Sequence, residues 1–95
     1  MITTQQLQLL KEGNKNAFEV LYRAYNARIY SFVLSMIGDA GVAKDITQDI
    51  FLQIWEKRLN IDLEGNFDGY LFKISQNMVY HYVRRELLLQ NYVDK

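Results

Sequence analysis

The chain has 95 residues, of which 49% are hydrophobic, so it is long enough to bury one small core. It contains no cysteine, which excludes disulfide bonds and thiolate zinc sites, and no apolar run approaches the roughly 18 residues of a membrane span, which predicts a cytoplasmic protein without membrane insertion. Basic and acidic side chains balance at 11 each. Phosphate neutralisation supplies most of the affinity of a free-standing nucleic-acid binder, and this chain has no basic excess. If the chain binds DNA, we expect it to do so weakly alone, or with a larger partner holding it in place.

The first predicted element is a short helix at the N-terminus. The absence of proline and the low count of 5 glycines favour helices over a turn-rich β fold throughout the chain. Thr3 or Thr4 can cap a first helix that ends near Lys11. The turn formers of residues 12–14 then break it.

A long second helix is expected to start at Asn14 or Asn16 and to end at Ile37. Gly38 follows directly and suits a C-terminal stop. The apolar side of this helix recurs at intervals of three and four, as expected of a core-facing stripe. It carries Ala17, Phe18, Leu21, Tyr25, Ile29, Phe32 and Met36.

A third helix is expected from about Gly41 to Leu59, with Asp39 as its N-cap. Its core side carries Val42, Ile46, Ile50 and Ile54, widened by Phe51 and Trp55. The opposite side, called here the acidic ridge, carries Asp45, Gln48, Asp49, Leu52 and Glu56. Such a ridge most often faces water, but an apolar residue among acids next to a tryptophan is also typical of a docking surface. Trp55 is expected either in the core with one edge showing or on that docking surface.

A loop over residues 60–66 separates the third helix from the fourth. Turn formers dominate this loop, while Ile61 and Leu63 are expected to anchor it. The fourth helix follows Asn66, a suitable N-cap, and runs to about Gln90.

The fourth helix combines an apolar face with a polar one. The apolar face carries Leu71, Ile74, Met78 and Tyr82, and we expect it in the core. The second face, called here the polar face, carries Lys73, Asn77, Tyr80, His81 and Arg84, followed by Arg85. Amide, aromatic and basic groups together suit bases and phosphates, although such a face taken alone is more often merely solvated. The leucines at 87–89 either pack back on the domain or lead to a second domain.

No pattern in the sequence predicts catalysis. There is no paired nucleophile and base, no glycine-rich phosphate loop and no metal-ligand spacing. His81 is the single histidine, so a histidine-rich metal site cannot form. Asp45 and Asp49 lie one helical turn apart but lack further ligands for a cation. We therefore expect neither an enzyme nor a bound metal or cofactor.

Three segments, in the right order, resemble a known family. Residues 45–55 (DITQDIFLQIW) resemble the D-(L/I)-(T/V)-Q-(D/E)-(V/I)-F-L-x-(L/I)-W signature of extracytoplasmic-function sigma factors. Residues 67–85 are similar to the F-x-x-(W/Y)-L-(Y/F)-(R/K)-I-(A/S)-x-N-x-x-x-D-x-x-R-R segment of that family. Residues 17–25 (AFEVLYRAY) match its A-F-x-x-L-Y-x-x-Y opening. The departure is His81, where the family usually has aspartate, and this puts the local contact there in doubt.

The resemblance implies an RNA polymerase sigma factor region 2 domain over residues 1–95: an all-α, compact bundle of three main helices plus a short N-terminal helix. Such a domain binds core RNA polymerase and recognises and melts the promoter minus-ten element. The family also carries a C-terminal helix-turn-helix domain, which this chain ends before, so we expect a fragment. Many relatives are held by an anti-sigma factor, and the sequence leaves open whether this one is.

The resemblance also assigns both exposed surfaces. The surface that binds the clamp helices of the polymerase beta-prime subunit is expected to comprise Asp45, Gln48, Asp49, Leu52, Trp55 and Glu56. The surface that holds the non-template strand of the minus-ten element is expected to comprise Asn60, Ile61, Asp62, Leu63, Asn66, Phe67, Lys73, Asn77, Tyr80, His81, Arg84 and Arg85. The alternative is a helical protein-interaction module, an adaptor that uses the acidic ridge and never touches DNA.

Opening a promoter requires a base to leave the stack, so the loop at 60–66 is expected to form a pocket that captures one. Ile61, Leu63 and Phe67 are expected to wall it, with Asp62 and Asn66 reading an edge of the base. Further along the helix, a neighbouring base is expected to meet Asn77 and Tyr80, and phosphates to meet Lys73, Arg84 and Arg85.

Overall fold

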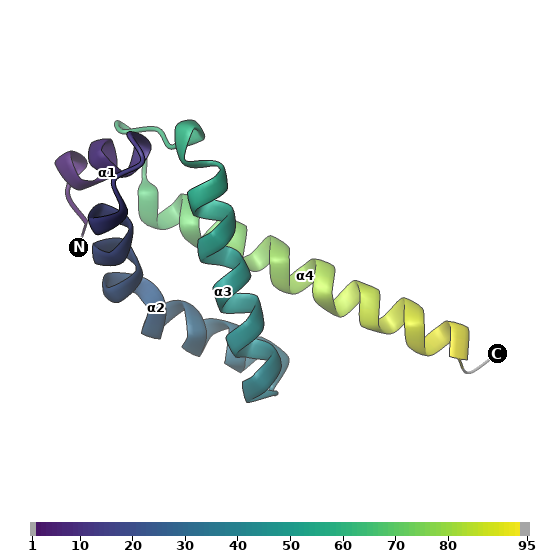
Figure 1. Ribbon diagram of the computed structural model, residues 1–95. Coiled ribbons are helices and arrows are strands. Elements are labelled where there is room, and N and C mark those ends of the chain that lie inside the picture. The colour runs from purple at the N-terminus through teal and green to yellow at the C-terminus, as the bar shows by residue number, and fades with distance from the viewer. Residues whose placement is uncertain (1, 94–95) are drawn as a thin grey trace.

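The computed structural model describes the backbone of residues 2–93 and the side chains through residue 91. The described residues are helical and contain no strand. The elements are α1 (Thr4–Lys11), α2 (Lys15–Ile37), α3 (Ala40–Glu56), a 3₁₀ turn η1 (Arg58–Asn60) and α4 (Phe67–Val93). Helix α2 packs against α1, α3 and α4, and α3 also packs against α4. Figure 1 shows that the yellow C-terminal part of α4 extends well beyond the other helices. The predicted all-α bundle of three main helices and a short first one is confirmed.

The helix starts are fixed by side-chain caps that the sequence predicted. Thr3, Asn14, Asp39 and Asn66 each accept a hydrogen bond from the backbone N–H three residues further on, which satisfies an otherwise unpaired donor. The caps of α1 and α2 are therefore Thr3 and Asn14, and the other candidates lie inside the helices. Gly38 ends α2 with a φ of 79°, a left-handed conformation that costs glycine little.

Two helix ends differ from expectation. Helix α3 ends at Glu56 and not at Leu59, because residues 58–60 tighten into the 3₁₀ turn. Arg58 stabilises this turn: its Nη1 donates to the Trp55 carbonyl at 3.1 Å, and its guanidinium lies 4.5 Å from the centre of the Trp55 ring. Helix α4 continues past Gln90 to Val93.

The core lies where α2, α3 and α4 meet, with α1 covering one end of it. Ten of the residues predicted to face the core are buried: Ala17, Leu21, Tyr25, Ile29, Ile46, Ile50, Phe51, Ile54, Leu71 and Ile74. Six others are half-buried and pack at its margin: Phe18, Phe32, Val42, Trp55, Met78 and Tyr82. Met36 is 59% exposed, so the prediction that it faces the core was wrong. Two buried hydroxyls join the core because Thr47 and Ser75 each donate to a backbone carbonyl one turn back. No helix within residues 2–93 is long and apolar enough to cross a membrane.

Candidate functional site

The acidic ridge is exposed along its whole length. All five of its side chains lie on the outer face of α3, opposite the buried isoleucines. Leu52, in the middle of the ridge, is 52% exposed. It lines an apolar cleft of about 290 Å³ together with Lys15, Phe18 and Trp55. The ridge therefore combines exposed carboxylates with a nearby apolar cleft.

Trp55 contributes to the fold and to the surface of this cleft. It is half-buried, as the sequence led us to expect of a core residue with one edge showing. Its ring meets Phe18 edge to face at 5.3 Å, which ties the end of α3 to the start of α2. The guanidinium group of Arg58, in η1, lies over the same ring. One edge of the indole is left to line the cleft.

The loop before α4 forms a second cleft, of about 190 Å³. Its lining comes from the loop and from the first turn of the helix: Asn60, Ile61, Asp62, Gly65, Asn66, Phe67 and Tyr70. Ile61 and Phe67 are buried beneath it, so the floor is part of the core. Lys11 holds the loop from the side of α1, because its Nζ donates to the Ile61 carbonyl at 2.8 Å. The cleft is thus positioned by packing and by a hydrogen bond across the chain.

Some polar atoms of this cleft are already used by the loop itself. The Asp62 Oδ1 accepts the Glu64 N–H at 3.0 Å, and the Asn66 Oδ1 accepts the Gly69 N–H at 3.0 Å. The Asp62 Oδ2 and the Asn66 amide N–H₂ are the groups left for a ligand, since no hydrogen bond among the described residues uses them.

The expected walls of this cleft need one correction and one addition. Leu63 does not wall it with Ile61 and Phe67, but lines a neighbouring cleft against Ile2, Thr4 and Leu7, because the loop turns between residues 62 and 65. Tyr70 was missed as a lining residue. It lies three residues after Phe67, a spacing that puts both on one helix face, and their rings lie 6.3 Å apart.

The polar face continues from this cleft along α4. Lys73, Asn77, Tyr80, His81, Arg84 and Arg85 are all exposed. Steps of three and four residues carry the face from Tyr70 to Arg84 without a break, a distance on the order of 20 Å at ~1.5 Å per residue. Tyr80 is 60% exposed and meets the His81 ring edge to face at 5.7 Å. Amide, aromatic and basic groups thus share one face with the cleft at its beginning.

The start of α4 is fastened to α2 by a buried phenol. The Tyr25 hydroxyl donates a hydrogen bond to the Asp68 carboxylate in the first turn of α4. Burial, together with this hydrogen bond and the carboxylate charge, raises the pKa of Tyr25 to about 12. The phenol is therefore the protonated donor across the physiological range, which fixes the cleft and the polar face relative to α2.

The end of α4 carries exposed apolar side chains. The leucines at 87–89 are each more than half exposed, so they do not pack back on residues 2–86. Among the described residues, no group of three or more histidine, cysteine or acidic side chains could hold a metal ion.

Most of the chain matches one known protein family. Residues 21–87 match the sigma-70 region 2 family, and this match covers most of α2, all of α3, the loop and most of α4. This chain belongs to the sigma-70 region 2 family. The three sequence segments that resemble sigma factors lie on the three long helices, two of them within the match and the opening segment of α2 overlapping it.

Individual relatives agree with this assignment. The chain is 24% identical over 86 residues to the ECF RNA polymerase sigma factor SigW of Bacillus subtilis, covering 90% of this chain and 46% of that protein. It is 30% identical over 81 residues to the ECF sigma factor SigK of a Mycobacterium species, covering 84% of this chain and 42% of that protein. The chain thus spans less than half the length of these curated relatives.

A solved structure shows the same fold. It is an engineered region 2 of sigmaE in complex with GTAAAA, determined by NMR. The two superpose with a TM-score of 0.82 at 20% sequence identity, and the likeness covers 90% of each chain. The region 2 fold is therefore that of this chain, and the predicted family is confirmed.

Proposed function

We propose that this chain is the part of a transcription initiation factor that binds core RNA polymerase and recognises and opens the promoter minus-ten element, with no catalysis of its own. The observation that carries the proposal is the pairing of two separate exposed surfaces on one region 2 fold. One is acidic with an apolar cleft beside it, and the other is a polar, basic and aromatic face with a cleft at its beginning.

The acidic ridge is proposed to bind the clamp helices of the polymerase beta-prime subunit. Carboxylates at Asp45, Asp49 and Glu56 suit a basic partner and steer its approach. The apolar cleft at Leu52 and Trp55 offers the kind of desolvated anchor that dominates binding energy in protein interfaces. A surface with both features favours a docking role over a merely solvated ridge.

The cleft at residues 60–70 is proposed to receive one base of the non-template strand. Extruding a base costs a few kcal/mol, which a pocket must offset with stacking and hydrogen bonds. Tyr70 offers a ring at the edge of the cleft, and Asp62 and Asn66 offer one free acceptor and one free donor group. The solved relative in complex with GTAAAA supports a nucleic-acid role for this fold.

On the polar face, some side chains are proposed to read the base sequence, while others hold the strand by its phosphates. Asn77 and Tyr80 carry groups that pair with or stack on a base, each worth on the order of 1–3 kcal/mol. Lys73, Arg84 and Arg85 carry charges that suit phosphates, which position a strand without reading its sequence. His81 stands where the family usually has aspartate, and it adds an aromatic edge beside Tyr80.

The test is transcription in vitro from a panel of single-base minus-ten variants, with the protein added to core polymerase. Asn77→Ala should change which variants are used, whereas Arg84→Ala should weaken all of them by a similar factor. If both gave the same uniform loss, the division between reading and holding would be wrong. If neither changed transcription, the polar face is merely solvated, and the adaptor interpretation, which needs only the acidic ridge, gains.

A further inference from the structure

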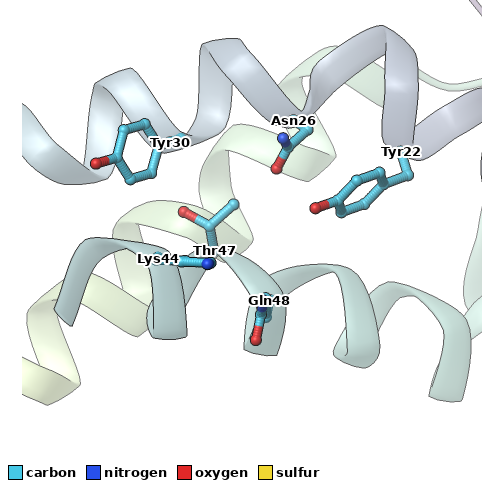
Figure 2. Close-up of a pocket in the computed structure, with 6 residues that line it drawn as sticks. All are labelled: Tyr22, Asn26, Tyr30, Lys44, Thr47 and Gln48. Carbon is cyan, nitrogen blue, oxygen red and sulfur yellow. The ribbon is translucent and has the colours of Figure 1, made fainter. Parts of the chain in front are cut away.

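A polar cleft lies between α2 and α3, beside the acidic ridge. It measures about 230 Å³ and is lined by Tyr22, Asn26, Tyr30, Lys44, Thr47 and Gln48. Figure 2 shows the Tyr22 hydroxyl and the Asn26 amide pointing from α2 into the space between the helices, toward Lys44 and Gln48 of α3. Gln48 also belongs to the acidic ridge, so the cleft opens onto the edge of the proposed polymerase surface.

The polar groups of this cleft are free to meet a ligand. Thr47 is the exception, since its buried hydroxyl donates to the Ala43 carbonyl at 2.7 Å. No side-chain hydrogen bond within residues 2–91 engages Tyr22, Asn26 or Lys44. In the same part of the chain the single ion pair joins Arg23 to Glu19, so no carboxylate of the protein neutralises Lys44 at ion-pair distance.

The charge of the cleft favours a ligand of negative charge. Lys44 is the one charged residue in the lining, and its ammonium group can only donate. The Tyr22 hydroxyl and the amide N–H₂ groups of Asn26 and Gln48 add further donors. A carboxylate is an acceptor-only anion, and hydrogen bonds between charged partners are about twice as strong as neutral ones. The lining therefore suits a carboxylate better than a guanidinium, which Lys44 would repel.

We propose that this cleft receives an aspartate or glutamate side chain of the protein docked on the acidic ridge. The inference rests on the proposed function in taking that protein to be core RNA polymerase. The partner then presents basic groups to the ridge and, beside them, an acidic group to the cleft. A register shift would place like charges together, so this alternation fixes where along α3 the partner binds.

The experiment is a titration of the dye-labelled 95-residue chain with core polymerase, followed by fluorescence anisotropy. Lys44→Met removes the charge at an exposed position and should raise Kd roughly fivefold, the size of a partly exposed ion pair. Lys44→Arg should restore most of the affinity. Arg23→Met removes an exposed charge of α2 outside the cleft and should leave Kd unchanged. Asn26→Asp places a carboxylate in the cleft and should raise Kd further than Lys44→Met does.

The sign of the effects decides the inference. Tighter binding by Lys44→Met or Asn26→Asp would mean a cationic occupant, and unchanged binding by Lys44→Met would mean that nothing charged enters the cleft. Either result overturns the proposal, and Lys44→Met decides alone if Asn26→Asp impairs folding. Asp49→Lys separates this inference from the proposed function. If Asp49→Lys loses polymerase and the Lys44 variants do not, only the cleft inference fails; if Asp49→Lys binds normally, the polymerase surface itself is wrong.

Discussion

The outer faces of α3 and α4 carry opposite chemistry, although both helices pack on the same core. The outer face of α3 exposes three carboxylates around a leucine, while that of α4 exposes a lysine, two arginines and aromatic rings. The overall balance of 11 basic and 11 acidic residues therefore does not reveal that these two surfaces carry opposite charge. Net charge averages over faces, so it predicts how strongly a free domain attracts DNA but not whether one face suits it.

The two faces also differ in how firmly they are held. The acidic ridge lies on a helix whose Ile46, Ile50 and Ile54 are buried along its length. The polar face is supported by Leu71, Ile74 and Val79, but none of the α4 side chains described after Val79, at residues 80–91, is buried. Figure 1 shows this end of α4 reaching past the bundle. The acidic ridge is therefore rigidly supported, while the polar face is anchored mainly through its first turns.

The largest expected effect concerns the anchor of the acidic ridge. Trp55→Ala removes an indole that packs on Phe18 and Arg58, and should lower the free energy of unfolding by about 3 kcal/mol, measured by urea denaturation. Leu52→Ala is the matched variant on the exposed side of the same cleft. It should change stability by less than about 0.5 kcal/mol while weakening polymerase binding. A small loss for Trp55→Ala would assign the indole to docking and not to the core.

The next largest effect is expected at the anchor of the polar face. Tyr25→Phe removes a buried hydrogen bond to the Asp68 carboxylate and should cost about 2 kcal/mol of stability. The pKa of Tyr25 is raised from 10.0 to about 12 in the folded state, so its stabilising contribution is present below pH 10 and is lost as pH rises to 12. Between pH 10 and pH 12 the free energy of unfolding should therefore fall more steeply for the native chain than for Tyr25→Phe. If the free energies of both proteins changed with pH in parallel, the phenol would not be held by this hydrogen bond.

A charge reversal on the acidic ridge should have a smaller effect, and only on binding. Asp49→Lys should weaken polymerase binding by more than about 1 kcal/mol if the contact is partly buried, in a pull-down with the beta-prime clamp helices. Its fold should survive, because the side chain is exposed. Glu19→Lys makes the same change on α2 outside the ridge and should bind as the native chain does. Equal losses in the two variants would point to net charge and not to the ridge.

The smallest effect is expected at the free end of α4. Leu88→Ser should change stability by less than about 0.5 kcal/mol, because this side chain is 59% exposed. Thermal unfolding followed by circular dichroism measures this directly. A clear loss of stability would mean that the leucines pack on the domain in solution, and that the polar face is held along its whole length.

Local sequence signals predicted the fold well. Caps at Thr3, Asn14, Asp39 and Asn66 need only a side chain and its next turn, and apolar spacing marked the buried faces of all three long helices. The early end of α3 was missed because it depends on how Arg58 folds back over Trp55. The leucine at 59 extended the helical pattern, yet it is 72% exposed in the 3₁₀ turn.

The candidate sites were predictable as helix faces but not as clefts. The spacing along α3 and α4 was enough to group the exposed residues of each surface. Leu63 was placed on the wrong side of its loop, because the direction of a side chain in a turn depends on the turn geometry. The cleft between Tyr22 and Lys44 joins residues of two helices, and only their packing brings these together.

The most direct test of two surfaces with separate tasks is one experiment on two variants. Core polymerase is titrated with each variant, and the saturated complex is then assayed for binding of a fluorescent single-stranded minus-ten oligonucleotide. Asp49→Lys should need a higher concentration to saturate polymerase but then bind the oligonucleotide as the native complex does. Asn77→Ala should saturate polymerase normally and bind the oligonucleotide more weakly. If each variant impaired both steps to the same extent, the two faces would not have separate tasks.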